Sequence, residues 1–356
     1  MKIAISYKVQ TESWGGGNQF VKELIKASKK QNHKVVFDLK DIDIDIILLI
    51  DPRSYNDEIT FGSFEIIRYL LLVNKKALVV HRINECDERR KTNHMNRLLR
   101  WSNYCADHTV FIASWLKDLN LYIKDTPNSV ILNGANPYDF RNYENCYWDG
   151  NSPIKIVTHH WSPNYMKGFD VYKHLDSLLA NSKYWQRIIE FTYIGNLPKG
   201  FLFKKANHIQ PISGQILGRE LSKHHVYLSA SINEPAGMHH IEGAICGLPI
   251  IYRQSGALPE YCEDFGISFE NTDYLPAIKE MLIQYKKYKE KISDYPHSSI
   301  KMTNNYLNLF SSLIINKKEI VSKRNIFRSP ILLIKNFLFI FMYFKNVVKF
   351  FYKLKL

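Results

Sequence analysis

Short apolar runs that alternate with longer amphipathic segments limit the fold of this chain more than any other feature. The short runs suit buried strands, and the segments between them have the periodicity of helices with one apolar face. Strands that alternate with helices form a parallel sheet that is covered on both faces. For the first part of the chain we predict strands over 2–7, 34–39, 45–50, 77–82, 109–112 and 129–132, and helices over 18–30, 64–73, 97–106 and 114–121.

The same pattern starts again after an interruption at residues 136–153, which are polar, aromatic and without regular periodicity. Because 356 residues exceed what one hydrophobic core usually holds, two similar halves are expected. The predicted fold class is α/β, with two doubly wound, Rossmann-like domains over 1–145 and 146–310 and a tail over 311–356. In the second half we predict strands over 155–158, 191–194, 226–229 and 249–252, and helices over 169–179, 238–246 and 273–292.

Positive charge is concentrated at the C-terminal end of the chain. The sequence has 48 Lys and Arg and 34 Asp and Glu residues, a net charge of +14. Residues 317–356 include ten basic residues and one acidic residue, or +9, so the rest of the chain carries only +5. A basic surface spread over the folded body, which nucleic-acid binding requires, is therefore not expected, and we predict no nucleic-acid partner.

The basic C-terminal tail is also apolar. Its uncharged stretch, 336–344, is far shorter than the roughly 20 residues of a spanning helix. On a helical wheel several basic residues fall within about 100°, although apolar residues share that arc. We predict a basic amphipathic helix that lies in the plane of an anionic membrane surface, and a helix docked on the protein body is the alternative. The basic residues of this arc are Arg328, Lys335, Lys345, Lys349 and Lys353.

Cysteine usage and the N-terminus indicate a cytoplasmic protein. The five cysteines include no C-x-x-C pair, so neither a disulfide framework nor a zinc site is expected. The first ten residues, MKIAISYKVQ, lack the apolar core of a signal peptide. Together with the tail, this predicts a cytoplasmic protein, peripheral on the inner face of the cell membrane.

Polar segments follow several predicted strands, at the edge where open α/β sheets bind ligands. Gly15–Gly17 precede the first helix, and their amides could approach a phosphate, although a plain tight loop explains them equally well. The segment 81–90 begins with His81 and can alternatively be a solvated loop with internal ion pairs. The segment 158–168 ends near Lys167, which could clamp a diphosphate. Its adjacent histidines point to opposite strand faces, so they do not predict a metal site.

The strongest signal is the pair of carboxylates Glu234 and Glu242, eight positions apart. Glu234 lies on the loop after a strand, and Glu242 lies one to two turns into the following helix. Two carboxylates placed in this way can reach two points of one elongated ligand. The amides between them, from Gly237 to His239, can donate to a phosphate or sugar oxygen. A helix-start acid without a ligand is the alternative interpretation of Glu234.

Taken together, these residues resemble glycosyltransferase family 4, whose members are retaining, nucleotide-sugar-dependent enzymes with the GT-B fold. Glu234–Glu242 match the family's E-x7-E motif, and Lys167-Gly168 match its K-G after the first strand of the second domain. Gly15–Gly17 lie where the family has its glycine loop. The resemblance covers about residues 1–300 in order, and it includes the late N-domain pattern at 106–114 and 130–134 and a G-x-x-P-E turn at 256–260.

The resemblance implies a division of roles among the site residues. Glu234 would contact the donor sugar's hydroxyls near the reacting carbon, and Glu242 would hold the nucleotide ribose. Lys167 would neutralise the diphosphate leaving group, whose negative charge grows as the sugar–phosphate bond breaks. His81 would lie beside the transferred sugar and the acceptor, so the catalytic set is Glu234, His81 and Lys167. Other predicted donor-binding residues are Gly16, Gly17, Gly237, Met238 and His239.

One position departs from the family pattern. The family commonly has an Arg five residues before the Lys, where this chain has Ser162. Arg253, which follows a predicted strand, is a possible replacement and completes the predicted donor-binding set. The resemblance also implies that no metal and no other cofactor is needed, in keeping with the absence of a D-x-D-type pair after a strand.

We therefore expect a retaining glycosyltransferase with two domains that face each other across a cleft. The donor would be a nucleotide sugar bound by the second domain. The acceptor would be a glycan or a lipid-linked molecule on the side of the first domain, in surface polysaccharide or glycolipid synthesis. The alternative is a catalytically silent GT-B-like protein that binds a nucleotide sugar or a lipid.

Overall fold

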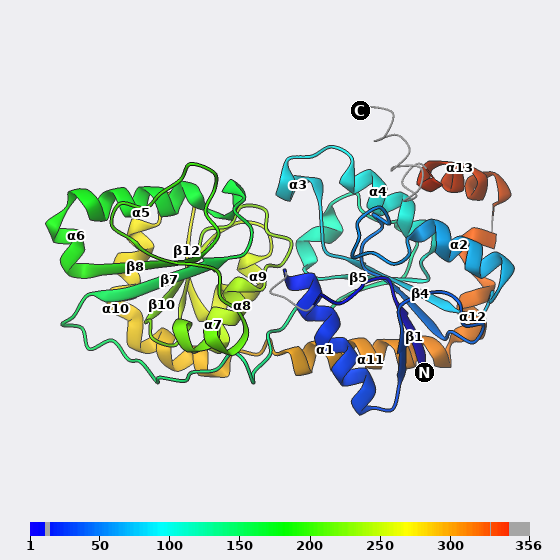
Figure 1. Cartoon of the computed structure of the whole chain (residues 1–356), viewed down its shortest axis with the longest axis horizontal. Coiled ribbons are helices and arrows are strands. Elements are labelled where there is room, and N and C mark those ends of the chain that lie inside the picture. Colours follow the sequence, from blue (N-terminus) through cyan, green and yellow to red (C-terminus); the bar gives the residue numbers. More distant parts are fainter. Residues whose placement is uncertain (11–14, 328, 342–356) are drawn as a thin grey trace. The chain divides into compact units, whose positions relative to one another are not determined.

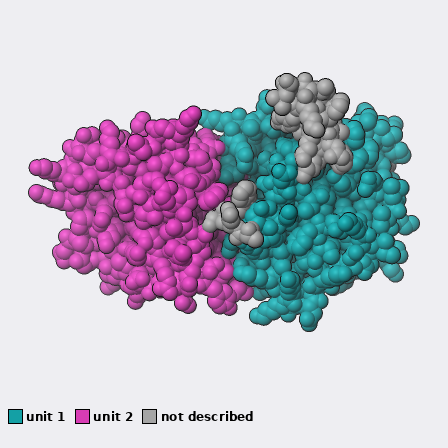
Figure 2. All heavy atoms as spheres, viewed as in Figure 1, with its two compact units in different colours: residues 1–12, 17–132, 302–356 teal, residues 13–16, 133–301 magenta. Residues whose placement is uncertain are grey.

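The computed structural model describes residues 1–10, 15–327 and 329–341. The chain divides into two compact units, which Figure 2 shows in different colours. Unit 1 comprises residues 1–12, 17–132 and 302–356, and unit 2 comprises residues 13–16 and 133–301.

Both predicted domain limits differ from this division. The limit at residues 145 and 146 falls inside unit 2, because the irregular segment before it packs on that unit: Tyr143 N–H donates to Ser222 Oγ and Trp148 N–H donates to Tyr285 Oη. The predicted tail over 311–356 belongs to unit 1 rather than forming a separate part.

Unit 1 is built around a parallel six-stranded sheet in the order β2-β1-β3-β4-β5-β6 (Figure 1). Its strands are β1 (Lys2–Ile5), β2 (Lys34–Val36), β3 (Ile46–Leu49), β4 (Leu78–Ile83), β5 (His108–Phe111) and β6 (Asn128–Val130). Its helices are α1 (Gly16–Lys30), α2 (Ser63–Leu72), α3 (Asp87–Arg90), α4 (Met95–Ser102), α11 (Ser299–Ile315), α12 (Lys317–Ser322) and α13 (Pro330–Phe341).

Alternate residues of these strands pack on opposite faces of the sheet, as the two-residue period of a strand requires. Ile3, Ile46 and Leu78 face a cluster that includes side chains of α1 and α11. Ala4 and Ile47 face the other cluster, which includes side chains of α2 and α13. The C-terminal helices therefore supply part of both cores of unit 1.

An ion pair with no exposed surface joins the C-terminal segment to the sheet of unit 1. Arg324 Nε and Nη2 donate to the two carboxylate oxygens of Asp107 at 2.8 and 2.7 Å. The same guanidinium donates to the backbone carbonyls of Lys75 and Ala77. Asp107 also accepts from Val79 N–H, so every donor and acceptor involved comes from unit 1.

The tail helix α13 docks on α2 and α4 within unit 1 (Figure 1). The rings of Phe337 and Phe64 lie 4.5 Å apart, the Phe339 ring stacks on Trp101, and Asn336 Nδ2 donates to the Trp101 carbonyl. Within the described residues, the docked helix that sequence reasoning left as an alternative is thus observed. Of the basic residues on the predicted wheel, Arg328, Lys345, Lys349 and Lys353 lie outside the described residues.

Unit 2 repeats the architecture with a parallel sheet in the order β12-β11-β10-β7-β8-β9. Its strands are β7 (Ile154–His160), β8 (Ile189–Gly195), β9 (Asn207–Ile209), β10 (Val226–Ser229), β11 (Ile250–Arg253) and β12 (Gly266–Phe269). Its helices are α5 (Phe169–Asn181), α6 (Lys183–Ile188), α7 (Gly214–Leu221), α8 (His239–Ile245), α9 (Leu258–Cys262) and α10 (Leu275–Lys291).

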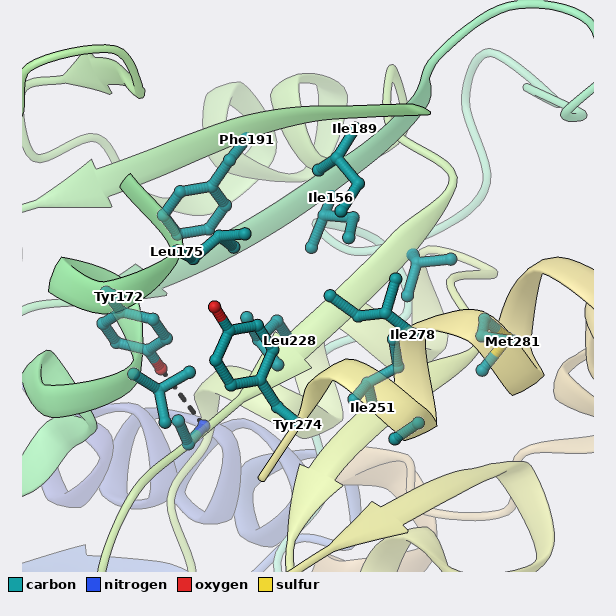
Figure 3. Close-up of a cluster of buried hydrophobic side chains, with 14 of the residues drawn as sticks. Ile156, Tyr172, Leu175, Ile189, Phe191, Leu228, Ile251, Tyr274, Ile278 and Met281 are labelled. Atoms are coloured by element: carbon teal, nitrogen blue, oxygen red, sulfur yellow. Dashed lines mark hydrogen bonds between the residues drawn. The ribbon is translucent and has the colours of Figure 1, made fainter. Parts of the chain in front are cut away.

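One face of this sheet packs against α5 and α10, and the shared core is drawn in Figure 3. The opposite face packs against α8, where Gly243 lies against the ring of Tyr227; a Cβ at this glycine would be 2.3 Å from the ring. The close approach needs glycine, and it brings α8 near the carboxyl ends of β7 and β10.

The doubly wound α/β prediction is confirmed for both halves. Each of the ten predicted strands corresponds to an observed one, with ends that differ by up to three residues. The strands β9 and β12 were not predicted, because each is a segment of three or four residues at an edge of the sheet. The predicted helix over 114–121 is a 3₁₀ helix, Ser114–Asp118.

Candidate functional site

The loops after β7 and β10 meet at the carboxyl edge of the unit 2 sheet, because these two strands are neighbours. The loop after β7 contains a 3₁₀ helix, Tyr165–Lys167, and Ile232 N–H of the other loop donates to the Met166 carbonyl at 2.8 Å. Gly168 ends the 3₁₀ helix with φ of 99°, and a Cβ there would lie 2.5 Å from the Ala230 side chain. Glycine is therefore required at position 168, where it lets the loop of Lys167 approach the loop of Glu234.

Lys167 and Glu234 form an ion pair at this point of contact. Lys167 Nζ lies 2.5 Å from Glu234 Oε2, and the two side chains are only 10% and 4% exposed. Burying either charge alone would be costly, so each charge stabilises the other. The predicted catalytic lysine and carboxylate are thus brought together although they are 67 positions apart.

The turn that was matched to G-x-x-P-E supports the backbone of Glu234. Ala257 N–H donates to the Glu234 carbonyl at 2.9 Å, and Asn233 N–H donates to Ser255 Oγ. Gly256 has φ of 60° and packs against the Glu234 backbone, where a Cβ would lie 2.5 Å from its nitrogen. The loop that holds Glu234 is therefore fixed by hydrogen bonds and close packing with this turn.

A buried tyrosine from α5 fixes the start of the same loop. Ala230 N–H donates to Tyr172 Oη at 3.2 Å, the bond drawn dashed in Figure 3. The same hydroxyl lies 2.9 Å from His160 Nε2 and 3.2 Å from Thr158 Oγ1. Burial raises the pKa of Tyr172, so its hydroxyl stays protonated. The core of unit 2 and its carboxyl edge are thus linked by hydrogen bonds.

The carboxylate of Glu242 is held by His159. His159 Nε2 lies 2.7 Å from Glu242 Oε2. Tyr227, in β10, lies 3.1 Å from His159 Nδ1 through its hydroxyl and also accepts from the His159 backbone N–H. The Glu242 side chain remains 13% exposed.

Three further histidines of this region are buried and neutral. Burial lowers the pKa of His160, His239 and His240, that of His240 to about 3. His239 Nε2 lies 2.9 Å from Ser229 Oγ, and its ring centroid lies 4.5 Å from that of His160. Both ring nitrogens of His240 lack a hydrogen-bond partner among the described residues. Within the part of the chain that the structure describes, no three His, Cys, Asp or Glu side chains are arranged to hold a metal ion.

Gly237, Met238 and His239 lie between the two carboxylates, as predicted. His239 begins α8, which has seven residues, and Glu242 N–H donates to the Met238 carbonyl. Gly237 packs against Glu234 and His239, where a Cβ would lie 2.5 Å from the His239 ring.

Arg253 has an acidic partner of its own. Its Nη2 donates to Asp170 Oδ2 at 2.7 Å, and Asp170 lies in the first turn of α5, close to Lys167 in sequence. The Arg253 side chain is only 6% exposed. This arginine stabilises the start of α5 through its ion pair.

The remaining predicted residues belong to the first sheet and its helices. Gly16 and Gly17 are the first two residues of α1, so the helix begins two residues earlier than predicted and includes part of the expected glycine loop. His81 lies inside β4 and is fully buried, and its Nδ1 accepts from Asn103 Nδ2. Burial lowers the pKa of His81 to about 3. This is the environment of a neutral core histidine, and no atom of His81 is exposed.

Sequence reasoning did not assign roles to His159, Tyr227 or Asp170. His159 was in a segment singled out for its position after a strand, but its partner is 83 positions away. Tyr227 is an interior strand residue, and Asp170 is one acid of an amphipathic helix. Nothing in their local sequence distinguishes them from core or surface residues.

No protein-family model matches this sequence, and no curated protein matches it. Among solved structures, sucrose-phosphate synthase from Thermosynechococcus elongatus is similar with a TM-score of 0.61 and 14% identity, over 88% of this chain and 99% of that chain. HepE from Anabaena in complex with UDP has a TM-score of 0.63 and 12% identity, over 88% and 100% of the two chains. The catalytic domain of starch synthase IV from Arabidopsis thaliana, bound to ADP and acarbose, has a TM-score of 0.61 and 12% identity, over 88% of this chain and 99% of that chain.

At these identities the likeness concerns the fold. Two six-stranded parallel sheets with flanking helices, together with these neighbours, show that the chain has the GT-B fold. The predicted fold is therefore confirmed.

Proposed function

We propose that this protein is a retaining glycosyltransferase that uses a nucleotide-sugar donor. The observation that carries the proposal is the buried Lys167–Glu234 ion pair at the carboxyl edge of the unit 2 sheet, with Glu242 at E-x7-E spacing beyond it. A lysine and two carboxylates in this arrangement provide groups for a diphosphate, a sugar and a ribose. Neighbours of the same fold include HepE solved in complex with UDP-glucose, which supports a nucleotide-sugar donor for this chain as well.

In the proposed reaction, Lys167 stabilises the charge that develops on the leaving diphosphate. Its ammonium has three N–H donors, so it can keep the Glu234 contact and still donate to phosphate oxygens. Glu234 accepts hydrogen bonds from donor sugar hydroxyls and stabilises the positive charge that grows on the sugar ring. Glu242 accepts from the ribose. The amides from Gly237 to His239 are additional donors in this proposal.

Several finer parts of the proposal rest on the resemblance. These are retention of anomeric configuration, hexosyl transfer, a glycan or lipid-linked acceptor bound by unit 1, and a role in surface polysaccharide or glycolipid synthesis. We also propose that the glycines of α1 take part in binding the donor, and that no metal is required. His81, which was predicted beside the transferred sugar, has no exposed atom and is left out of the proposed binding set. A chelator should then leave transfer activity unchanged.

Hydrolysis and transfer assays across a panel of nucleotide sugars test the proposal. Glu234→Gln should lower turnover by roughly 10²–10³, the effect of losing one preorganised electrostatic group. Glu190→Gln, an exposed carboxylate on β8, is the matched control and should keep full activity. A Glu234→Gln enzyme with wild-type turnover would remove the assignment. Because the substitution leaves Lys167 buried without its anion, folding of the variant should be verified by circular dichroism.

The role of Lys167 is tested by product inhibition. Lys167→Ala should weaken inhibition by the nucleoside diphosphate far more than inhibition by the nucleoside, since only the former carries the phosphates. Equal weakening of both would mean that Lys167 does not touch the diphosphate. Tight diphosphate binding without turnover on any donor would favour the alternative, a catalytically silent binding protein.

We further propose that the enzyme works as a cytoplasmic protein at the inner face of the cell membrane, and that α13 contacts the lipid. The side of α13 that faces away from unit 1 is apolar: its exposed residues follow helical spacing and include one charge. They are Ile331, Leu332, Ile334, Lys335, Leu338 and Phe341. A docked surface helix normally has a polar outer face, so this face needs an apolar partner.

An anionic bilayer fits the charge of this segment. Residues 330–356 contain no Asp or Glu and include Lys335 and four later lysines in the sequence. A second copy of the chain would bring the same positive charge to the contact, whereas anionic headgroups complement it, and the cytoplasmic leaflet is the anionic one. Within the described residues, every helix is too short or too polar to span a bilayer.

Vesicle flotation tests this contact on the full chain. Changing both Ile334 and Leu338 to Glu should weaken binding to anionic vesicles by more than tenfold, since each apolar side chain contributes on burial and each Glu is repelled. Ile283→Glu is the control, because Ile283 is also an exposed aliphatic residue of a helix but lies on α10 of unit 2. Binding should decrease with added salt. Wild-type binding by the double variant would refute the contact, and a dimer that the variant disrupts would identify a second copy as the partner.

A further inference from the structure

His159 and Tyr227, two side chains that the proposed reaction does not use, form a hydrogen-bonded chain that ends on Glu242. Tyr227 Oη lies 3.1 Å from His159 Nδ1, and His159 Nε2 lies 2.7 Å from Glu242 Oε2. His159 is 7% exposed, and Tyr227 is completely buried. His159 and Tyr227 lie on the neighbouring strands β7 and β10 of the sheet.

The direction of these hydrogen bonds follows from the chemistry of the groups. A carboxylate only accepts, so the proton at the Glu242 contact is on His159 Nε2. In the neutral imidazole, Nδ1 then accepts, and the Tyr227 hydroxyl donates to it. Burial raises the pKa of Tyr227 well above its usual value, which keeps that proton in place. The Tyr227 oxygen in turn accepts from the His159 backbone N–H.

Protonation of His159 would leave its contact with Glu242 unchanged. In the imidazolium both ring nitrogens donate, and the Tyr227 hydroxyl can turn to the His159 carbonyl, 3.4 Å away. Nε2–H points to Glu242 in both states. The hydrogen bond therefore holds the Glu242 carboxylate in place whichever protonation state His159 has.

The packing of α8 makes this contact possible. Gly243 follows Glu242 and lies against the Tyr227 ring, where any larger residue would force the helix away. The ring of Tyr227 therefore sets the distance of α8 from the sheet. Its hydroxyl sets the tautomer of His159. Because Oε2 is bonded to His159, the rotation of the Glu242 carboxylate is restricted.

We propose that His159 is a positioning residue, seated by Tyr227, that orients Glu242 toward the ribose and thereby makes the site prefer ribonucleoside over 2′-deoxyribonucleoside diphosphates. The inference rests on the proposed function, in which Glu242 binds the ribose. A free carboxylate would have to lose its rotational freedom on binding, whereas a carboxylate held in place has already lost it. His159→Leu should therefore weaken binding of the ribose without affecting the rest of the nucleotide.

Calorimetry with UDP, GDP and ADP and with their 2′-deoxy analogues tests this on the full chain. For the diphosphate that binds most tightly, the wild type should prefer the ribose form by roughly ten- to a hundredfold, the range for a hydrogen bond to a charged group. His159→Leu should reduce this preference to within about threefold. His159→Gln, whose amide can donate from the position of Nε2, should restore most of it, and Tyr227→Phe should have an intermediate effect. In donor kinetics, His159→Leu should raise KM with little change in kcat.

His174→Leu is the matched control, because His174 is an exposed histidine of α5 that bonds to Tyr274 instead. It should keep the wild-type preference. A His159→Leu protein that keeps the full ribose preference overturns the inference, as does one that loses both ligands equally together with thermal stability. If the wild type binds and discriminates the diphosphates but transfers no sugar, the proposed reaction fails and the positioning role stands. A wild type that binds none of the diphosphates overturns both.

Discussion

Removing the guanidinium of Arg324 should destabilise unit 1 by about 3–5 kcal/mol, the cost of breaking a buried ion pair by deleting one partner. In Arg324→Met the methionine fills part of the space, but four hydrogen bonds are lost. Asp107 would retain the Val79 N–H as a donor, but its carboxylate is almost completely buried, so water cannot replace the lost hydrogen bonds. Such a loss is a large part of the 5–15 kcal/mol that typically stabilises a domain.

The pH dependence of this loss follows from the carboxylate. Burial raises the pKa of Asp107, and Arg324 opposes that rise. Without Arg324, the folded-state pKa of Asp107 would be higher still, and well above the unfolded value of about 3.9. Between the unfolded and the folded pKa, the folded state keeps a proton that the unfolded state has released. The free energy of unfolding therefore decreases as the pH rises from the unfolded pKa to the folded pKa. The deficit of Arg324→Met should therefore be larger at pH 7 than at pH 5.

Urea denaturation followed by circular dichroism at the two pH values measures both effects. Arg187→Met, on the exposed side of α6, is the control and should change the free energy of unfolding by less than about 0.5 kcal/mol. In the double variant with Asp107→Asn, the loss should be smaller than the sum of the two single losses, because neither charge is left alone. A loss below about 1 kcal/mol for Arg324→Met, or an equal loss at both pH values, would refute the reasoning.

Three further predictions concern stability and packing. Burial lowers the pKa of His240 to about 3, so below about pH 6.5 the unfolded state binds a proton that the folded state does not bind. The free energy of unfolding therefore decreases as the pH is lowered, by about 2 kcal/mol between pH 7 and pH 5. His240→Leu should recover that difference in denaturant titrations, and an unchanged pH slope would contradict the assignment. Deleting residues 326–356 should lower the Tm by several degrees, because the core of unit 1 loses Ile326 and Ile340, and an unchanged Tm would show that these contacts contribute little. Gly243→Ala should cost about 1–3 kcal/mol by pushing α8 from Tyr227, measurable by thermal denaturation, and a stability equal to the wild type would mean that the helix can shift freely.

The sequence by itself determined the local elements of this protein. The period of the apolar residues distinguishes strands from helices within windows of about ten residues, and it placed ten strands near their observed positions. The spacing from Glu234 to Glu242 and the Lys167-Gly168 pair are likewise local patterns, so the loops that hold them could be identified directly. Their arrangement after strands predicted the edge of the sheet where they lie.

Only the tertiary structure decided which distant residues meet. The partners Asp107 and Arg324 are 217 positions apart, and nothing near either residue specifies the other. The apolar, basic sequence of α13 is consistent with a free membrane helix or with a docked one. The structure shows that its described residues are docked, because they pack against Phe64 and Trp101.

The site shows the same division. His81 is polar and follows a buried run, which suggested a site residue, but the strand continues to Ile83 and encloses it. His159 gave no signal of its own, and its role depends on α8 lying close enough to the sheet for Glu242 to reach it. Periodicity and spacing describe one segment at a time, whereas burial and hydrogen-bond partners are set by the segments that pack against it, and these the chain brings together only when it folds.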